Sequence, residues 1–132
     1  MLLVDTNVLV DVLQDDPQWA AWSIAQMRAQ ARLHQLAINP VIYAEISLSF
    51  STLEALDRAV TTLDLQLCDI PRPTLFLAAR AFAQYRQRGG RKTQVLPDFF
   101  IGAHAAVEGW PLLTRDAGRF RTYFPSVEVL AP

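Results

Sequence analysis

Short apolar runs alternate with longer amphipathic stretches along this chain, and this alternation constrains its fold more than any other feature of the sequence. Each run is too short for a stable helix, and most runs end at polar or structure-breaking residues, as buried strands do. Four runs have this character, and a fifth is expected to form an edge strand: Leu2–Val4, Leu36–Ile38, Leu65–Ile70, Leu112–Thr114 and Val127–Leu130.

Five helices are expected between these runs, and most of them begin at a proline. Proline suits the first turn of a helix, and glycine suits the position past the last turn. The expected helices run from Pro17 to about His34, from Pro40 to about Phe50, from a cap at Ser51 or Thr52 to Leu63, from Pro73 to Gly89-Gly90 and from Pro97 to Gly109. Strands that alternate with helices form a mainly parallel sheet covered by helices. The sequence therefore predicts an α/β fold, in which a short, mainly parallel central sheet of four to five strands is sandwiched by helices, in a single domain over residues 1–132.

The composition places the chain among globular proteins and favours a reducing compartment. Hydrophobic residues make up 52% of the sequence and charged residues 19%, which is unlike a disordered chain. Cys68 is the only cysteine, so an intramolecular disulfide is excluded and a buried thiol is expected. No stretch approaches the ~18 uninterrupted apolar residues of a membrane-spanning helix. We therefore expect a cytoplasmic protein that does not enter a membrane.

The net charge of −1 conceals an uneven distribution of charged residues. Residues 1–85 contain nine acidic and five basic residues, whereas residues 86–132 contain four acidic and seven basic residues. Eleven of the twelve basic residues are arginine, whose forked guanidinium group suits contact with phosphate. A basic cluster is most often a solvated surface, but at the rim of an acidic site it would attract the backbone of a nucleic acid. The candidates for such contacts are Arg86, Arg88, Arg91, Lys92, Arg115 and Arg119.

Three aspartates fall where α/β proteins often bind ligands, beyond the carboxyl ends of strands or in the first turn of a helix. Asp5 directly follows the first apolar run, and Asp116 comes two residues after the run that ends at Thr114. Asp98 follows Pro97 in the first turn of an expected helix. Each also has an ordinary explanation: a helix cap for Asp5, a helix-dipole partner for Asp98 and a turn residue for Asp116.

Glu45 lies in the middle of an expected helix whose neighbouring residues are almost all apolar. A carboxylate there is unfavourable unless a partner compensates it, although a solvated position on an amphipathic helix would also explain it. If the four acids converge, charges about 4 Å apart repel by roughly 4 kcal/mol at an effective dielectric constant near 20. Such a cluster either holds protons at a raised pKa or binds a divalent cation.

The ligand chemistry of the four acids favours magnesium or manganese. Carboxylate oxygens are the hard ligands that Mg²⁺ and Mn²⁺ prefer, and the sequence offers no set of Cys and His residues for zinc. An ion on such a cluster can activate water and hold a phosphodiester oxygen. This is the chemistry of nucleases.

Two further polar residues are not expected to take part in chemistry. Asp11 lies six residues after Asp5, which points it toward another side of a helix. His104 lies about a turn and a half beyond Asp98 among alanines, and it is expected to pack within the fold.

Four segments of the sequence resemble the PIN domain family of ribonucleases. They are Leu3-Val4-Asp5-Thr6-Asn7-Val8, Tyr43-Ala44-Glu45-Ile46, Leu96-Pro97-Asp98-Phe99-Phe100-Ile101-Gly102-Ala103-His104-Ala105 and Leu112-Leu113-Thr114-Arg115-Asp116. More narrowly, the chain is similar to the VapC-type toxins of bacterial and archaeal toxin–antitoxin pairs, over a match from Leu2 to about Phe124. Any one segment alone is weak, whereas the four together in this order are highly characteristic.

The resemblance implies which residues form the metal site. The residues that match the family's metal-site carboxylates, and are expected to be catalytic, are Asp5, Glu45, Asp98 and Asp116. Of these, the three aspartates are expected to bind the ion. Some relatives carry a further acid three residues after Asp116, where this chain has Arg119. We therefore expect one firmly bound Mg²⁺ or Mn²⁺ and a second ion that binds weakly or only with substrate.

Two polar residues are expected to orient these metal ligands by hydrogen bonds. Asn7 matches an asparagine of the family, and Thr114 matches a hydroxyl residue that hydrogen-bonds within the site. Helix capping for Asn7 and strand-end polarity for Thr114 explain the same residue types equally well. As partners of the ligands, the two side chains would fix the directions of the carboxylates.

The resemblance also implies a function and partners. The chain would be an endoribonuclease dependent on Mg²⁺ or Mn²⁺, in which water activated by the metal hydrolyses an RNA phosphodiester. As the toxin of a type II toxin–antitoxin system, it would form a homodimer and bind an antitoxin. In the family, the antitoxin's tail lies along an apolar groove and commonly brings a basic side chain to the acidic site.

Two other functions remain open from the sequence. One is a metal-dependent phosphotransfer or phosphatase domain with Asp5 as the nucleophile, since such folds also place an aspartate after the first strand. Such a phosphatase usually has a second aspartate two residues on, where this chain has Asn7, and no lysine occupies a late strand end because Lys92 lies in a glycine-rich loop. The other is a PIN-like module that binds RNA or a partner without cutting, which the intact acids disfavour.

Overall fold

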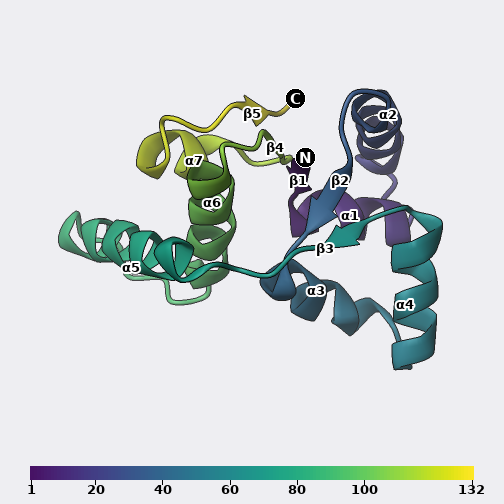
Figure 1. The fold of residues 1–132 in the computed structure, drawn as a ribbon, viewed down its shortest axis with the longest axis horizontal. Coiled ribbons are helices and arrows are strands. Elements are labelled where there is room, and N and C mark those ends of the chain that lie inside the picture. Colours follow the sequence, from purple (N-terminus) through teal and green to yellow (C-terminus); the bar gives the residue numbers. More distant parts are fainter.

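The strands of the computed structural model, which describes residues 1–132, form one five-stranded sheet in which every neighbouring pair is parallel. The strand order is β3-β2-β1-β4-β5, so β1 lies at the centre and β3 and β5 form the edges (Figure 1). The strands are β1 (Leu2–Val4), β2 (Leu36–Ile38), β3 (Gln66–Leu67), β4 (Leu112–Leu113) and β5 (Val129–Leu130). This architecture confirms the predicted α/β class with a short parallel sheet sandwiched by helices.

Three strands are shorter than predicted. The run Leu65–Ile70 pairs only through β3, and the run Val127–Leu130 only through β5. Both lie at edges of the sheet, where a strand has a single neighbour to pair with. Thr114 falls outside β4, although its backbone N–H still donates a hydrogen bond to the carbonyl oxygen of Leu130 at 3.0 Å.

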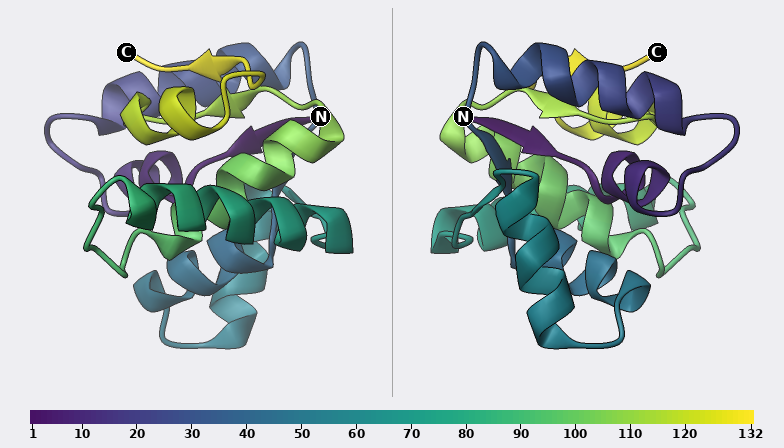
Figure 2. Two further views of the ribbon diagram at one scale, coloured as in Figure 1. Left: turned by 90° about the vertical axis from the view of Figure 1, so that its left-hand side faces the viewer. Right: turned by 90° about the vertical axis from the view of Figure 1, so that its right-hand side faces the viewer.

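Seven α-helices and one 3₁₀ helix connect the strands. Their bounds are α1 (Thr6–Leu13), α2 (Ala20–Ala31), α3 (Pro40–Ile46), η1 (Ser47–Ser49), α4 (Leu53–Thr62), α5 (Arg72–Gln87), α6 (Leu96–Glu108) and α7 (Gly118–Tyr123). Helices α5, α6 and α7 lie on one side of the strands and α1 and α2 on the other, and Figure 2 turns each side toward the viewer. No helix combines the length and the apolar character needed to cross a membrane.

Local turns shift some helix boundaries from the predicted ones. The helix expected from Pro17 begins three residues later, because Asp16 accepts hydrogen bonds from two backbone N–H groups and forms a turn first. The helix expected over residues 40–50 is α-helical only over α3 and then continues as η1. Helix α7 was not predicted, because it has only six residues and begins at Gly118 without a side-chain cap.

Helix caps define the ends of the elements that carry the site. The buried side chain of Asn39 accepts a hydrogen bond from the N–H of Ile42 at 2.9 Å and begins α3. Thr52 does the same for α4, through the N–H of Ala55 at 3.1 Å. Gly109 ends α6 in the left-handed conformation, with φ of 71°, as the predicted glycine stop requires.

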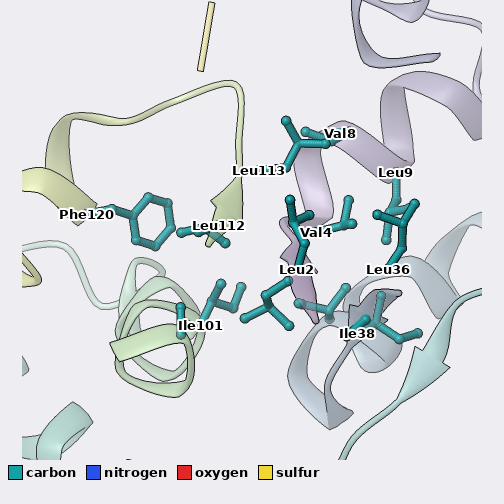
Figure 3. Packing of buried hydrophobic residues seen from close by; sticks show 14 of the residues in the cluster. Leu2, Val4, Val8, Leu9, Leu36, Ile38, Ile101, Leu112, Leu113 and Phe120 are labelled. Carbon is teal, nitrogen blue, oxygen red and sulfur yellow. The ribbon is translucent and has the colours of Figure 1, made fainter. Parts of the chain in front are cut away.

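The core packs against both faces of β1. All three residues of Leu2–Val4 are completely buried, which is the pattern of a central parallel strand. Figure 3 shows Leu112 of β4 near Ile101 of α6 and Phe120 of α7, while Leu9 of α1 lies on the other side of β1. Burial of these apolar side chains is the main source of stability for such a sheet.

Gly102 allows α6 to pack closely against the aromatic residues of the C-terminal region. A Cβ atom at this position would lie 2.3 Å from Cδ2 of Phe124 and 3.1 Å from Cδ1 of Phe120. A larger residue therefore displaces these rings. The close contact holds α6 beside α7, and with it Asp98 in the first turn of α6.

Polar residues directly follow the three central strands. Asp5 follows β1, Asn39 follows β2 and Thr114 follows β4, and all three are buried. Because parallel strands end at the same edge of a sheet, these residues gather at one place on the molecule. This edge is the position of the candidate site.

Candidate active site

Asp5 is the most buried acid of the site, with 4% of its surface exposed. It lies between β1 and α1 and caps α1, since Oδ1 accepts a hydrogen bond from the N–H of Thr6 at 2.8 Å. Its other oxygen, Oδ2, accepts a hydrogen bond from the hydroxyl of Thr114 at 2.7 Å. Both carboxylate oxygens therefore have a fixed partner.

The environment of Asp5 disfavours its ionised form. Burial raises the pKa of Asp5 to about 7, against the lowering effect of the hydrogen bond from Thr114. The negative charges of Asp98 and Glu45 also raise this pKa, and the backbone N–H of Thr6 lowers it. A carboxyl whose pKa is raised by burial and by neighbouring acids would lose its proton readily if a cation were bound beside it.

Glu45, on α3, has the compensating partner that its apolar helix requires. The hydroxyl of Thr6 donates a hydrogen bond to Oε1 of Glu45 at 2.7 Å. Thr6 thus contacts two acids, Asp5 through its backbone and Glu45 through its side chain. Glu45 is half-buried and faces the site, so it is not a solvated residue on an outer helix face.

Asp98, in the first turn of α6, forms an ion pair with Arg119. Nη1 of Arg119 donates to Oδ2 of Asp98 at 2.6 Å, and both side chains are partly exposed. Burial raises the pKa of Asp98, whereas the charge and hydrogen bond of Arg119 lower it. The negative charges of Glu45 and Asp116 raise the pKa of Asp98 again.

Asp116 is the exposed member of the group and lies in the loop between β4 and α7. Its backbone N–H donates to the hydroxyl oxygen of Thr114 at 3.1 Å. Nδ2 of Asn7 approaches the same hydroxyl oxygen at 3.4 Å, and Oδ1 of Asn7 accepts from the N–H of Arg115 at 3.2 Å. Thr114 therefore holds Asp5 and the backbone of Asp116, and Asn7 holds Thr114 and Arg115.

The four acids fit a hard divalent cation by their chemistry, although they do not enclose an ion as they stand. No group of three Asp, Glu, His or Cys side chains is arranged to hold a metal ion. Neighbouring carboxylates nevertheless raise the pKa of both Asp5 and Asp98. A cation at this place would relieve the repulsion between them.

Comparisons with known proteins decide the family. A family model described as the PIN domain matches residues 2–124. The chain belongs to the PIN domain family. No curated protein matches the sequence significantly.

Solved structures show the same PIN fold at low sequence identity. VapBC2 from Rickettsia felis, bound to a DNA fragment from its promoter, superposes with a TM-score of 0.76 and 18% identity, over 99% of this chain and 98% of the other. DNA-bound VapBC from Salmonella typhimurium gives 0.72 and 18%, over 99% and 98%. FitAcB from Neisseria gonorrhoeae gives 0.69 and 20%, over 98% and 96%. These likenesses support the fold alone.

The six basic candidates fall into two groups in this PIN domain. Arg86, Arg88, Arg91 and Lys92 are exposed at the end of α5 and in the following loop. Arg115 and Arg119 are half-buried and paired with acids, Arg115 with Asp11 and Arg119 with Asp98. Only the first group presents unpaired cations at the surface.

Asp11 is the residue whose importance sequence reasoning missed. It is buried and forms an ion pair with Arg115, the residue before Asp116. Two signals were present in the sequence. Asp11 interrupts an apolar helix as Glu45 does, and it lies four residues after Asn7, which places both on one helix face.

His104 packs within the fold, as predicted. Its ring is buried, with Nδ1 3.1 Å from Nδ2 of Asn39 and its centre 5.2 Å from that of Trp110. Burial lowers the pKa of His104, so the ring is neutral at physiological pH. The contact joins α6, which carries Asp98, to the residue that caps α3.

Proposed function

We propose that this PIN domain is an endoribonuclease dependent on Mg²⁺ or Mn²⁺ and the toxin of a type II toxin–antitoxin pair. The observation that carries the proposal is the buried carboxyl of Asp5, with a pKa of about 7, beside Asp98 and Glu45 at the end of the central strand. PIN domains are generally nucleases and typically use divalent metals. Clustered acids with raised pKa values are typical of such sites.

Three aspartates would hold the ion, and a fourth acid would complete the negative region. The residues assigned to the ion are Asp5, Asp98 and Asp116, with Glu45 as the additional catalytic acid. When bound, Mg²⁺ or Mn²⁺ supplies an activated water and neutralises a phosphodiester oxygen. The hydroxyls of Thr6 and Thr114 orient the carboxylates of Glu45 and Asp5 toward this task.

Arg119 limits the site to one firm ion. Its guanidinium binds Asp98, so an ion at Asp98 has to displace it. After displacement, Arg119 still lies at the rim and becomes free to contact an RNA phosphate. A second ion would be held weakly or only with substrate, because this cation lies where some relatives supply a further acid.

The RNA backbone would lie across the exposed cations beside the site. The end of α5 and the following loop present Arg86, Arg88, Arg91 and Lys92 to solvent. Cations at the rim attract a polyanion, while the carboxylates attract the metal. Contacts to phosphate of this kind give affinity without base specificity.

An antitoxin is the proposed protein partner. The similar structures include toxin–antitoxin complexes, VapBC2 among them. In this chain an apolar pocket suits such a partner, and it is lined by Val12, Ile24, Met27, Arg28 and Leu63. A homodimer, which is typical of these toxins, completes the proposed assembly.

The geometry disfavours Asp5 as a phosphotransfer nucleophile. Both of its oxygens accept hydrogen bonds, and the side chain is almost completely buried. A nucleophilic carboxylate must be reached by a bulky phosphoryl group, whereas a small cation needs only a lone pair that the single hydrogen bond leaves free on each oxygen. The buried side chain therefore suits a ligand of a metal better than a group that attacks phosphate.

The test is RNA cleavage by the purified chain with Mg²⁺, with Mn²⁺ and with EDTA. Wild type is compared with Asp5→Asn, Asp98→Asn and the matched control Asp69→Asn, an exposed aspartate after β3. We expect cleavage only with metal, at least ~100-fold loss in the two site variants and no loss in the control.

Cleavage that survives both EDTA and the two site substitutions would contradict the proposal. Metal-independent binding of RNA without cleavage would favour a non-cutting module instead. A labile aspartyl phosphate, formed on incubation with a small phosphodonor, would favour the phosphotransfer function.

A further inference from the structure

Asp11 is a buried acid that the proposed mechanism leaves unused. Only 2% of its surface is exposed, and it lies on α1. Its Oδ2 accepts hydrogen bonds from Oγ of Ser23 and Nε of Arg115, both at 2.9 Å, and its Oδ1 accepts from Nη2 of Arg115 at 3.1 Å. The two-point contact with a planar guanidinium holds this carboxylate in one orientation.

Arg115 is attached to the N-terminal helices through both its side chain and its backbone. Its guanidinium binds Asp11 and lies 5.3 Å from the centre of the Trp19 ring. Its backbone N–H donates to Oδ1 of Asn7 at 3.2 Å. Arg115 is therefore the anchor of the loop between β4 and α7.

Asp116 depends on this loop for its position. Its carboxylate is exposed and accepts none of the hydrogen bonds of the chain, whereas its backbone N–H donates to Oγ1 of Thr114. An exposed side chain without partners is placed only by the backbone that carries it. That backbone is fixed by the two residues before Asp116, by Thr114 through its hydroxyl and by Arg115 through its backbone N–H.

We propose that Asp11 and Arg115 are positioning residues, whose ion pair fixes the loop that presents Asp116 to the metal. The inference rests on the proposed function, because it assigns a role within that site. Neither residue touches the ion or the substrate. This proposed role makes Arg115 part of the structure that supports the site, in place of the RNA contact expected from the sequence.

The test measures Mn²⁺ affinity by titration calorimetry for wild type, Asp11→Asn, Arg115→Met and the double variant. Each single variant is expected to weaken Mn²⁺ binding by ~10–100-fold, the usual effect of removing a partner behind a ligand. The double variant is expected to bind no more weakly than either single variant, because both residues act through one ion pair. Arg115→Lys keeps the charge without the fork and is expected to retain part of the affinity.

A control separates positioning from loss of stability. Leu56→Ala removes a buried side chain of α4 away from the acids, so it is expected to lower the melting temperature and leave Mn²⁺ affinity unchanged. If Arg115→Met does not fold, the proposal can still be tested with the double variant, because that variant leaves no buried charge without a partner. The double variant by itself is expected to show the same ~10–100-fold loss of Mn²⁺ affinity.

Unchanged Mn²⁺ affinity in the folded variants, with normal binding by wild type, would overturn this inference and leave the proposed function intact. A wild-type chain that binds no Mn²⁺ would overturn the proposed function and this inference with it. Binding of a labelled single-stranded RNA in EDTA gives the second readout and is expected to be the same in all variants. A loss in Arg115→Met and in the double variant, but not in Asp11→Asn, would make Arg115 an RNA contact and overturn the inference.

Discussion

The hydroxyl of Thr114 donates a hydrogen bond to Oδ2 of Asp5 at 2.7 Å, and this bond joins two residues that are 109 positions apart in the sequence. The same hydroxyl oxygen accepts a hydrogen bond from the N–H of Asp116 at 3.1 Å. The bond to Asp5 favours the ionised carboxylate and opposes the effect of burial on the pKa of Asp5. Thr114 therefore governs how readily Asp5 exchanges its proton for a cation.

Thr114→Val keeps the shape of the side chain and removes the donor, so the pKa of Asp5 is expected to rise further. We expect cleavage at neutral pH to fall by ~10–100-fold and to recover in part as the pH is raised. Thr114→Ser keeps the hydroxyl and is expected to cleave nearly as wild type does. A pH–rate profile checks this. A profile of Thr114→Val that is not shifted from that of wild type would contradict it.

The raised pKa of Asp5 predicts that the metal-free protein loses stability as the pH rises toward 7. The ordinary pKa of aspartate is about 4, so between roughly pH 4 and pH 7 the folded state holds a proton that the unfolded state has released. In this window the free energy of unfolding falls by up to about 1 kcal/mol per pH unit for this group. Urea unfolding in EDTA measures it, and Asp5→Asn is expected to have a flatter dependence. Identical pH dependences would argue against a raised pKa.

Arg119→Gln tests whether this arginine competes with the metal for Asp98. Because the ion pair is partly exposed, its loss is expected to lower the metal-free stability by at most ~1 kcal/mol. The rise in melting temperature on adding Mn²⁺ is expected to be larger than in wild type, since Asp98 no longer has to release a cation. Arg121→Gln, an exposed position on the same helix, is the control. A smaller rise in Arg119→Gln would mean that Arg119 supports the ion.

Gly102→Ala is expected to destabilise the fold by ~1–3 kcal/mol, because the new methyl group meets the Phe124 ring. In a helix with free space, the same change stabilises by up to ~1 kcal/mol. The sign of the effect therefore reports the close contact, and urea unfolding measures it. A gain in stability would mean that α6 and the aromatic residues pack less tightly.

Removing two exposed cations is expected to weaken RNA binding in proportion to the phosphates that they contact. For single-stranded RNA, the slope of log affinity against log salt should decrease in magnitude by about 1.4 in the variant Arg88→Gln/Arg91→Gln. Arg58→Gln, an exposed arginine on α4, is the control. A slope equal to that of wild type would place the RNA elsewhere on the surface.

Much of the fold could be predicted because its signals are local. A run such as Leu2–Val4, apolar at every position, is typical of a strand buried on both faces, and prolines and glycines mark helix ends wherever they occur. Glu45 also gives a local signal, because a carboxylate on an apolar helix needs a partner, and the structure supplies it in Thr6.

The features that could not be predicted depend on how distant segments meet. Arg119 and Asp98 are 21 positions apart, and Arg115 and Asp11 are 104 positions apart. Which arginine meets which aspartate depends on the path of the loop after β4, and no local pattern encodes that path. The short edge strand β3 belongs to the same class, since its length reflects how far β2 accompanies it and not its own apolar run.

The strand order has a consequence for a chain that is still being synthesised. The strand that precedes Asp5 leaves the ribosome well before its neighbour β4, which Thr114 and Asp116 follow in the sequence. Until then one side of β1 has no partner strand, and Thr114 and Asp116 have not yet been synthesised. A nascent chain therefore has no complete acidic site, so any activity of that site is delayed until translation has passed Asp116.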